Sequence, residues 1–471
     1  MFHPKEICCR VCGILSGLLL GLPNLFGELA PVQCFALLPV LICVIKWKLS
    51  RGVLMAAGMY MALAYTIPQI VVLLLPPPIV VILILDFVVV MMLLVLAANR
   101  LLSKPTAIGL FIFAALVVVL DWANFTLIPF WGTAQSIVRP WSSYRHLIAF
   151  TSITGMGGII FLLALLQAAA ASMINAGRIQ KPIIKAVGIT IAVFAVLNVL
   201  SLMGTPGNTM KVAAIGWDKA DVEQVGSLER PNGFETLFAA PIRAAAAQNV
   251  QLVVTPELGF YVDQYDRPDW IERVTDLART NNIHLAVGYC DAPSIKNRML
   301  FVDNTGKVLT EYTKTYLTPY EVFNKGDGQP KMIEIDGIKT GGMICHDDNY
   351  TPISRRYGRK TAGIIAVPTL DWKEVKFAHL QNCIHRTIES RYALVRAAFG
   401  GISAIISPRG KIIASFDHVT NGHGMIIANV DVYSQCTIYS LLGDWFVLAS
   451  GIFVVGCIIN AKLLTKRQNE V

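Results

Sequence analysis

The sequence predicts a polytopic α-helical membrane domain of about eight transmembrane helices, joined to an α/β layered domain. Three observations carry this prediction. First, 54% of the 471 residues are hydrophobic and 15% are charged, whereas soluble globular chains average about 45–50% apolar and about 25% charged residues. Second, apolar runs recur at close to the roughly 20 residues that span a bilayer. Third, helical and extended patterns alternate within residues 204–437.

The membrane prediction follows from apolar runs that precede residue 204, with one more near the end of the chain. The runs are 7–23, 31–45, 52–75, 79–98, 106–120, 147–171, 183–203 and 445–464. A Gly/Pro-rich stretch, SLMGTPGNT, follows the seventh run and is typical of a linker. We therefore expect transmembrane helices in 1–203, a separate domain in 204–437, and a last transmembrane helix with a cytoplasmic tail in 438–471.

The net charge of +9 does not indicate a nucleic-acid partner, because the basic residues cluster in short loops between apolar runs. These loops fall on one side of the predicted membrane map. They contain Lys5, Arg10, Lys46, Lys48, Arg51, Arg100, Lys104, Arg178, Lys181, Lys185, Lys462, Lys466 and Arg467. The positive-inside rule then places both termini in the cytoplasm and residues 204–437 on the outer face.

The ten cysteines show no His/Cys spacing suited to zinc. Those in or beside apolar runs are interpreted as small hydrophobic residues. They are Cys8, Cys9, Cys12, Cys34, Cys43 and Cys457.

The domain at 204–437 alternates in a pattern typical of layered α/β folds. Helix-like residues 234–249 lead into a buried strand at 250–257, and 269–282 lead into a strand at 283–289. Hairpins are predicted at 297–312 and 401–416, and a helix is predicted over 378–399.

Three reactive side chains follow extended segments of this domain. Glu257 closes VQLVVTPE, Lys314 lies in EYTKTYL, and Cys345 closes GGMIC. Side chains at strand ends of layered α/β folds converge on one rim. A free thiol has a pKa of about 8.5 and needs a neighbouring base or cation to react at neutral pH. Lys314 could supply the positive charge, and Glu257 could accept the thiol proton.

These motifs resemble a known family. TPELG, YTKTYLTPYE and GGMICHDD resemble the Glu-Lys-Cys motifs of the carbon–nitrogen hydrolase (nitrilase) superfamily. DWANFTLIPFWGTAQS and SITGMGGIIFLLALLQAAAA are similar to the spans that precede this domain in apolipoprotein N-acyltransferases. Two motifs depart from the family pattern, which usually has Cys-Tyr-Glu at the nucleophile and Pro-Phe-Gly-Glu after the lysine. Here the sequences are Cys345-His346-Asp347 and Pro319-Tyr320-Glu321.

The resemblance implies a nitrilase-like αββα sandwich and a set of site residues. Expected in catalysis are Cys345 as nucleophile, Glu257 as general base and then acid, Lys314 as oxyanion stabiliser, and Glu321 as a second glutamate. Expected to line the substrate site are His346, Asp347 and Trp372. Four aromatic residues follow Glu257 closely, namely Phe260, Tyr261, Tyr265 and Trp270. We further hypothesise that some of them, Phe260 and Tyr261 among the candidates, form a mobile flap that dips into the membrane interface. The alternative is that these aromatic residues pack against the first helix of the domain.

The implied reaction transfers an acyl chain from a membrane phospholipid, through a Cys345 thioester, to the α-amino group of an apolipoprotein acceptor bearing an N-terminal diacylglyceryl-cysteine. It requires no cofactor and no metal. The His346-Asp347-Asp348 run does not indicate a metal site, because adjacent residues on an extended segment point to alternate faces. The expected protein is a monomer in the bacterial cytoplasmic (inner) membrane, with its catalytic domain on the periplasmic side.

Other functions remain open at this point. A membrane-tethered amidohydrolase would use the same three residues with water as acceptor, and the altered His346-Asp347 pair keeps an inactive homologue possible. A transporter is disfavoured because few ionisable residues lie inside the spans, with Asp86 the main one. The remaining histidines are interpreted as surface or satisfied structural residues. They are His284, His379, His385, His418 and His423.

Overall fold

The structure, a computed structural model, describes residues 3–73, 75–128 and 130–469, with side chains described as far as residue 461. The chain divides into two compact units. The membrane unit comprises Met1–Leu202 and Leu442–Val471, and the α/β unit comprises Met203–Leu441. Leu74 of the predicted third span, and the side chains of Lys462, Lys466 and Arg467, lie outside what the structure describes.

The membrane unit is a bundle of apolar helices, as predicted. Seven segments of the described chain are long and apolar enough to cross a membrane. They are α1 (Pro4–Leu25), Gly27–Lys46, α3 (Arg51–Leu73), α4 (Pro77–Leu102), α5 (Ala107–Leu127), α7 (Gly157–Ala176) and α8 (Lys181–Leu202). The segment Gly27–Lys46 is a 3-10 helix (Gly27–Cys34) followed by α2 (Leu38–Lys46). The predicted eighth helix is α17 (Trp445–Asn469), apolar over Trp445–Ala461.

One predicted span begins later than expected. Residues 147–171 were expected to be one helix, but α7 starts at Gly157, after two short 3-10 helices (Gly132–Gln135 and Arg139–Tyr144) and the single turn α6 (Thr151–Thr154). Gly155 has a φ of 65°, which ends α6 because a right-handed helix needs a negative φ.

Small residues let the membrane helices approach closely. A Cβ on Gly13 would lie 2.4 Å from the carbonyl oxygen of Ala57 in α3, and one on Gly17 would lie 2.1 Å from that of Met61. Such contacts are typical of helices that pack inside a bilayer, where small side chains favour association.

The α/β unit contains two sheets. The first has the order β13 (Gly424–Val432), β1 (Asn208–Gly216), β2 (Leu252–Val254), β4 (His284–Asp291), β5 (Lys296–Val302) and β6 (Val308–Thr313), with β3 (Phe260–Val262) paired to β4. The second has the order β12 (Ile412–Asp417), β11 (Ile402–Ile406), β10 (Ala393–Phe399), β9 (Ile364–Leu370), β8 (Ile338–Gly342) and β7 (Met332–Ile335).

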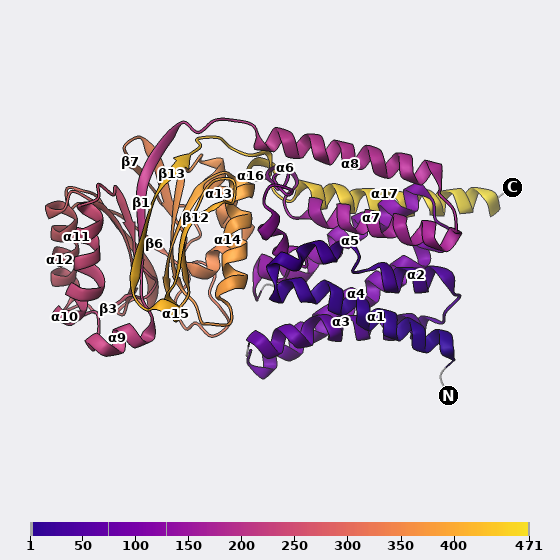
Figure 1. Ribbon diagram of the computed structural model, residues 1–471, viewed down its shortest axis with the longest axis horizontal. Helices are drawn as coiled ribbons and strands as arrows, with labels where there is room; N and C mark the ends of the chain where they lie inside the picture. The colour runs from indigo at the N-terminus through magenta and orange to yellow at the C-terminus, as the bar shows by residue number, and fades with distance from the viewer. Residues whose placement is uncertain (1–2, 74, 129, 470–471) are drawn as a thin grey trace. The chain divides into compact units, whose positions relative to one another are not determined.

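The two sheets face each other and helices cover their outer faces. Figure 1 shows α11 (Ala240–Ala246) and α12 (Arg267–Thr280) outside the first sheet, and α13 (Thr351–Arg359) and α14 (Lys376–Ser390) outside the second. Val254 of the first sheet and Val395 of the second share one buried apolar cluster. Burying a side chain of this size contributes about 1.5–3 kcal/mol. The predicted αββα sandwich is therefore confirmed.

The remaining elements of this unit are short helices. They are α9 (Lys219–Val225), α10 (Pro231–Gly233), a π-helical turn (Phe234–Ala239), a 3-10 turn (Cys345–Asn349), α15 (His418–Asn421) and α16 (Ile438–Leu442). The predicted hairpins at 297–312 and 401–416 correspond to β5–β6 and β11–β12.

The predicted helix at 378–399 is wrong in its second half. Helix α14 ends at Ser390, Arg391 takes a left-handed φ of 60°, and residues 393–399 form β10. Strand β10 lies between β9 and β11, so sheet pairing overrides the helix propensity of its Ala, Leu and Arg residues.

Candidate active site

Glu257 lies just beyond β2 and is 1% exposed. Its Oε1 accepts hydrogen bonds from Lys314 Nζ at 2.7 Å and Asn297 Nδ2 at 2.6 Å, and its Oε2 accepts from the Leu370 backbone N–H at 2.7 Å. Leu258, which follows it, has a left-handed φ of 52°. This turn directs the carboxylate into the end of the sandwich, where three donors fix its orientation.

Lys314 follows β6 directly and is fully buried. Its Nζ donates to Glu257 and, at 2.6 Å, to Oε1 of Glu321. Burial alone lowers the pKa of Lys314, but negatively charged neighbours, among them Glu257 and Glu321, raise it well above its usual value. The ammonium therefore stays charged at neutral pH, between two carboxylates.

Cys345 begins the 3-10 turn that follows β8 and is 5% exposed. Its φ of 47° lies in the left-handed region, which is uncommon for a residue with a side chain. The thiol donates a hydrogen bond to the Leu370 carbonyl oxygen, with 3.5 Å between sulfur and oxygen. The backbone N–H of Leu370 in turn donates to Glu257. Cys345 and Glu257 thus contact the same residue at the end of β9.

The two glycines that precede the Met343-Ile344-Cys345 segment lie in closely packed surroundings. A Cβ on Gly341 would lie 2.4 Å from the Tyr357 ring, and one on Gly342 would lie 1.9 Å from Met299 of the facing sheet. The GGMIC sequence therefore lets β8 approach the opposite sheet and brings Cys345 to the buried end of the sandwich.

Burial raises the pKa of the Cys345 thiol well above its usual value, Glu257 adds to the increase, and Lys314 opposes it. The resting thiol is therefore protonated. Attack by sulfur requires a base to remove this proton during the reaction. Of the carboxylates near the thiol, Glu257 affects its pKa more than Asp371 does, and Asp371 is already paired with Arg396.

Asp347 is fully buried and organises two loops. Its Oδ1 accepts from the Thr315 and Tyr316 backbone N–H groups at 3.1 and 2.7 Å. Its Oδ2 accepts from the Tyr312 hydroxyl at 2.8 Å and the Ile344 N–H at 3.1 Å. Asp347 therefore joins the residues after Lys314 to the residue before Cys345, and acts as a positioning residue.

His379 of α14 lies in a buried charge network beside the thiol. Its Nδ1 faces Asp371 Oδ1 at 2.8 Å, and its Nε2 faces Asp348 Oδ1 at 3.0 Å. Arg396 pairs with both aspartates. The Cys345 sulfur, one Asp371 carboxylate oxygen and one His379 ring nitrogen could each bind a metal ion, and these three atoms lie within 4.8 Å of one another. Because both ring nitrogens already face carboxylates and Arg396 adds positive charge, the group suits a charge network better than a metal ion.

The other predicted lining residues occupy different environments. His346 is 2% exposed, with its ring nitrogens facing Asn349 at 2.9 Å and the Tyr350 hydroxyl at 3.2 Å. Trp372 is half-buried two residues beyond Leu370. Glu321 is partly exposed, and burial raises its pKa while Lys314 opposes the increase.

The flap hypothesis is wrong for Phe260. This residue of β3 is 1% exposed and packs against Phe238 and Trp270, with ring centroids 5.0 and 5.7 Å away. The alternative stated above, packing within the domain, describes it correctly. Tyr261 points the opposite way and is 64% exposed, because neighbouring side chains of a strand face opposite sides.

Comparison with known proteins agrees with this geometry. The carbon–nitrogen hydrolase family matches residues 212–437. An apolipoprotein N-acyltransferase of Geobacter metallireducens is 25% identical over 386 residues, covering 70% of this chain and 71% of that protein. The α/β unit therefore resembles the carbon–nitrogen hydrolase family over residues 212–437. A deaminated glutathione amidase of Dictyostelium discoideum is 29% identical over 205 residues, covering 37% of this chain and 70% of that protein.

Among solved structures, an amidase of Nesterenkonia sp. AN1 is 20% identical, with a TM-score of 0.41, and covers 49% of this chain and 93% of that chain. The match to the carbon–nitrogen hydrolase family over residues 212–437 confirms the resemblance that the motifs carry. The match to the Geobacter protein is longer than the α/β unit, Met203–Leu441.

Sequence reasoning missed four contributors to the site. They are the Asn297 amide, the Leu370 N–H, Asp371 and His379. Asn297 carried a partial signal, since it begins the hairpin that precedes Lys314. Leu370 and Asp371 carried none, because they reach the site only through the pairing of β9 with β8 and β10. His379 carried none, because only the packing of α14 brings it to Asp371 and Asp348.

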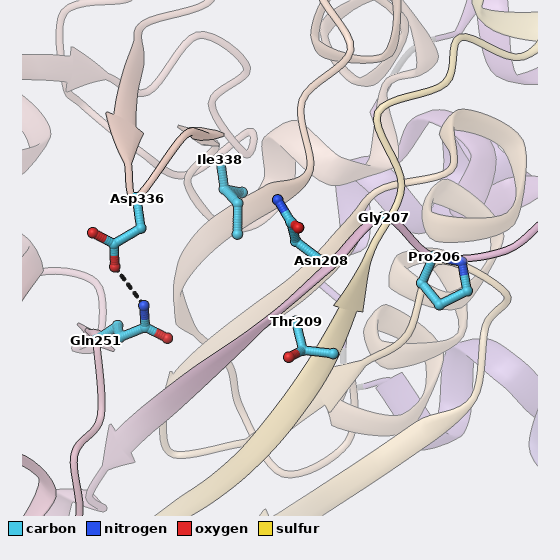
Figure 2. A pocket seen from close by; sticks show the side chains of 7 residues that line it. All are labelled: Pro206, Gly207, Asn208, Thr209, Gln251, Asp336 and Ile338. Carbon is cyan, nitrogen blue, oxygen red and sulfur yellow. Dashed lines mark hydrogen bonds between the residues drawn. The ribbon is translucent and has the colours of Figure 1, made fainter.

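A separate pocket of about 470 Å³ lies at the other end of the first sheet. Figure 2 shows it beside Asn208 and Thr209, with Gln251 hydrogen-bonded to Asp336. Asn208 begins β1 and Gln251 precedes β2, which runs parallel to β1. Glu257 follows the far end of β2, so this pocket is remote from the candidate active site.

Proposed function

We propose that this protein is an apolipoprotein N-acyltransferase that works through a thioester on Cys345. One observation carries the proposal. Glu257 is held by Lys314, Asn297 and the Leu370 N–H, and Cys345 contacts that same Leu370. Similarity to named apolipoprotein N-acyltransferases over about 70% of the chain supports the acyl-transfer reaction.

In the first half-reaction, Cys345 Sγ attacks the carbonyl carbon of a phospholipid acyl ester. Glu257 takes the thiol proton as the carbon–sulfur bond forms. The Lys314 ammonium stabilises the negative oxygen of the tetrahedral intermediate, a role worth about 10²–10³ in rate per donor. The intermediate expels the lysophospholipid alkoxide, which receives the proton from Glu257, and a thioester remains.

In the second half-reaction, the α-amino group of a lipid-modified N-terminal cysteine attacks the thioester carbonyl. Glu257 accepts the proton that the amine loses. The tetrahedral intermediate then expels the Cys345 thiolate, which recovers the proton from Glu257. The products are an N-acylated lipoprotein and the free enzyme.

Both proposed substrates are anchored in lipid, which accounts for a reactive domain attached to membrane helices. We propose that the protein is a monomer in a bacterial inner membrane, with both termini cytoplasmic and residues 204–437 on the periplasmic side. The arrangement of basic loops in the sequence supports this orientation.

Mass spectrometry of the full-length protein after incubation with phospholipid vesicles tests the first step. The peptide containing Cys345 is expected to gain the mass of one acyl chain, and subsequent addition of a diacylglyceryl-cysteine peptide is expected to remove it and yield an amide. Cys345→Ala should gain no mass, while Cys290→Ser, a half-buried control thiol in β4, should behave like wild type. An unmodified Cys345 in protein that still acylates the peptide would contradict the proposal.

A membrane-tethered amidase is the second candidate, since named amidases match the α/β part of the chain. It would release the acyl group to water. Free fatty acid in the presence of excess acceptor peptide, with no N-acyl peptide formed, would favour this candidate.

A further inference from the structure

Three thiols of the membrane unit lie together at one end of two neighbouring helices. Cys8 and Cys12 belong to α1 and Cys43 belongs to α2, and their sulfur atoms all lie within 4.8 Å of one another. Cys8 and Cys12 are four residues apart, so they occupy one face of α1 about one turn apart. The sequence shows the spacing of Cys8 and Cys12 but does not show that Cys43 joins them, because a separate 3-10 helix lies between α1 and α2.

The spacing suits a metal ion coordinated by sulfur. Zn–S bonds are about 2.3 Å long, so sulfur ligands around one ion lie roughly 4 Å apart, within the range that the three thiols already occupy. Thiolate ligands select soft ions such as Cu⁺ and Zn²⁺. No backbone rearrangement of either helix is needed to bring the three sulfurs to one ion.

The position of Cys43 is fixed by polar contacts on both sides. The carbonyl of Ile42 accepts a hydrogen bond from the Asn175 side chain of α7 at 3.3 Å, and that of Val44 accepts one from Asn99 of α4 at 2.9 Å. Cys43 itself is buried. Outer contacts of this kind hold ligands in place before the metal arrives.

Access and charge are also compatible with an ion. Cys8 is exposed and lies within two turns of the start of α1, whereas Cys12 is half-buried. Three thiolates around one cation leave a net negative charge. Basic residues flank the cluster along both helices, with Lys5 and Arg10 on α1 and Lys46 in the last turn of α2.

We infer that Cys8, Cys12 and Cys43 form a thiolate site for a soft metal ion, Zn²⁺ or Cu⁺, that clamps α1 to α2. Each thiol loses its proton to solvent as its sulfur–metal bond forms, so binding is weaker at low pH. In the proposed orientation the site faces the cytoplasm, where thiols are kept reduced and available. The site is separate from the acyl-transfer residues, and its test does not depend on them.

The test uses full-length protein in detergent under reducing conditions, loaded separately with Zn²⁺ or Cu⁺ and freed of unbound metal. Wild type is expected to retain about one ion per chain of at least one metal, with X-ray absorption showing sulfur neighbours at about 2.3 Å. Cys43→Ser and Cys12→Ser should lose most of this ion. Cys34→Ser, a half-buried thiol of the same unit outside the cluster, should retain it.

Thermal denaturation keeps the inference testable if a serine variant folds poorly. Removal of the metal from wild type by a chelator is expected to lower the Tm of the membrane unit, with no shift for Cys43→Ser. Equal retention of metal by wild type and the cluster variants, absence of retained metal from wild type, or nitrogen and oxygen neighbours in the absorption spectrum would each overturn the site.

Discussion

Cys345 occupies a strained backbone position that its neighbours have to stabilise. Its left-handed φ of 47° costs an L-residue roughly 1–2 kcal/mol. The Asp347 carboxylate accepts a hydrogen bond from the N–H of Ile344, the residue just before the cysteine, and three further hydrogen bonds. A hydrogen bond to a charged group contributes about 1.5–3 kcal/mol, which is enough to offset the strain and hold the thiol at the end of β8.

This role predicts a dependence of activity on the ionisation of Asp347. Burial raises the pKa of Asp347 to about 7, with hydrogen bonds from Tyr316 and Tyr312 opposing the increase. The ionised carboxylate accepts hydrogen bonds from four donors. Protonation gives one of its oxygens a hydrogen that faces one of these donors, so that hydrogen bond is lost. The rate of Cys345 acylation by a short soluble ester should therefore fall as pH drops through about 7.

Asp347→Asn mimics the protonated form and should lower this rate by about 10–100-fold, the equivalent of one or two lost hydrogen bonds. The pH–rate profile of this variant should lack the fall, or limb, that wild type shows near pH 7. The surface variant Asp336→Asn should keep the wild-type profile. An unchanged limb in Asp347→Asn would show that another group titrates there.

The sequence predicted which residues meet at the candidate active site better than it predicted the contacts of their neighbours. Glu257, Lys314 and Cys345 could be found because each follows an extended segment. His346 and Asp347 were expected to line the site, but the 3-10 turn that begins at Cys345 directs both into internal hydrogen bonds. Such a turn depends on partners from the Lys314 loop, which no local pattern contains.

At the scale of the elements, β4 supports Glu257, the proposed general base, through a glycine. A Cβ on Gly288 would lie 2.2 Å from the Pro256 carbonyl oxygen and 2.9 Å from the Glu257 Cα. Both are backbone atoms, so Gly288→Ala should displace Glu257 from its donors and destabilise the fold by about 1–3 kcal/mol.

In the Gly288→Ala variant, the rate of Cys345 acylation should fall by about tenfold or more, because a small misplacement of a catalytic group strongly reduces the reaction rate. Gly207→Ala is the matched control, since its Cβ would meet nothing closer than 4.0 Å. A folded Gly288→Ala protein with wild-type acylation would show that the Glu257 position tolerates the shift.

The charge network on α14 predicts how stability of the α/β unit varies with pH. Burial lowers the pKa of His379, but Asp348 and Asp371 outweigh it and raise the pKa from 6.5 to about 9. The stabilising contribution of the imidazolium is therefore fully present below about 6.5 and is lost as pH rises through about 9. The Tm of wild type should decrease across this interval.

His379→Gln should lower the free energy of unfolding by about 3–5 kcal/mol at neutral pH, since it removes one partner of a buried pair. It should also flatten the Tm between pH 6.5 and 9. The exposed control His423→Gln should preserve the wild-type slope. A slope that survives in His379→Gln would assign the titration elsewhere.

At the scale of the whole molecule, hydropathy alone divided the chain into its two kinds of structure. Apolar content is a local property that adds along the sequence, so membrane helices could be found one at a time. Sheet order could not, because β10 pairs with strands distant in sequence, and its helix-favouring residues gave the opposite prediction.

The proposed substrates also predict how the molecule distinguishes bilayer from solution. Tyr261 and Tyr265 are 64% and 80% exposed, and tyrosine favours the headgroup level of a membrane. Replacing both with Ser should slow acylation of Cys345 from phospholipid vesicles by about tenfold, equivalent to roughly 1.4 kcal/mol of interfacial binding, while leaving acylation by a short soluble ester unchanged. Ile413→Ser in β12, a partly exposed position on another strand, serves as the control and should change the acylation rate with neither substrate.

Because Phe260 is part of the core, Phe260→Ser should instead reduce acylation by both substrates by unfolding the domain. Equal loss on vesicles and soluble ester in the double tyrosine variant, without a change in Tm, would assign these residues to the reaction itself and not to the membrane interface.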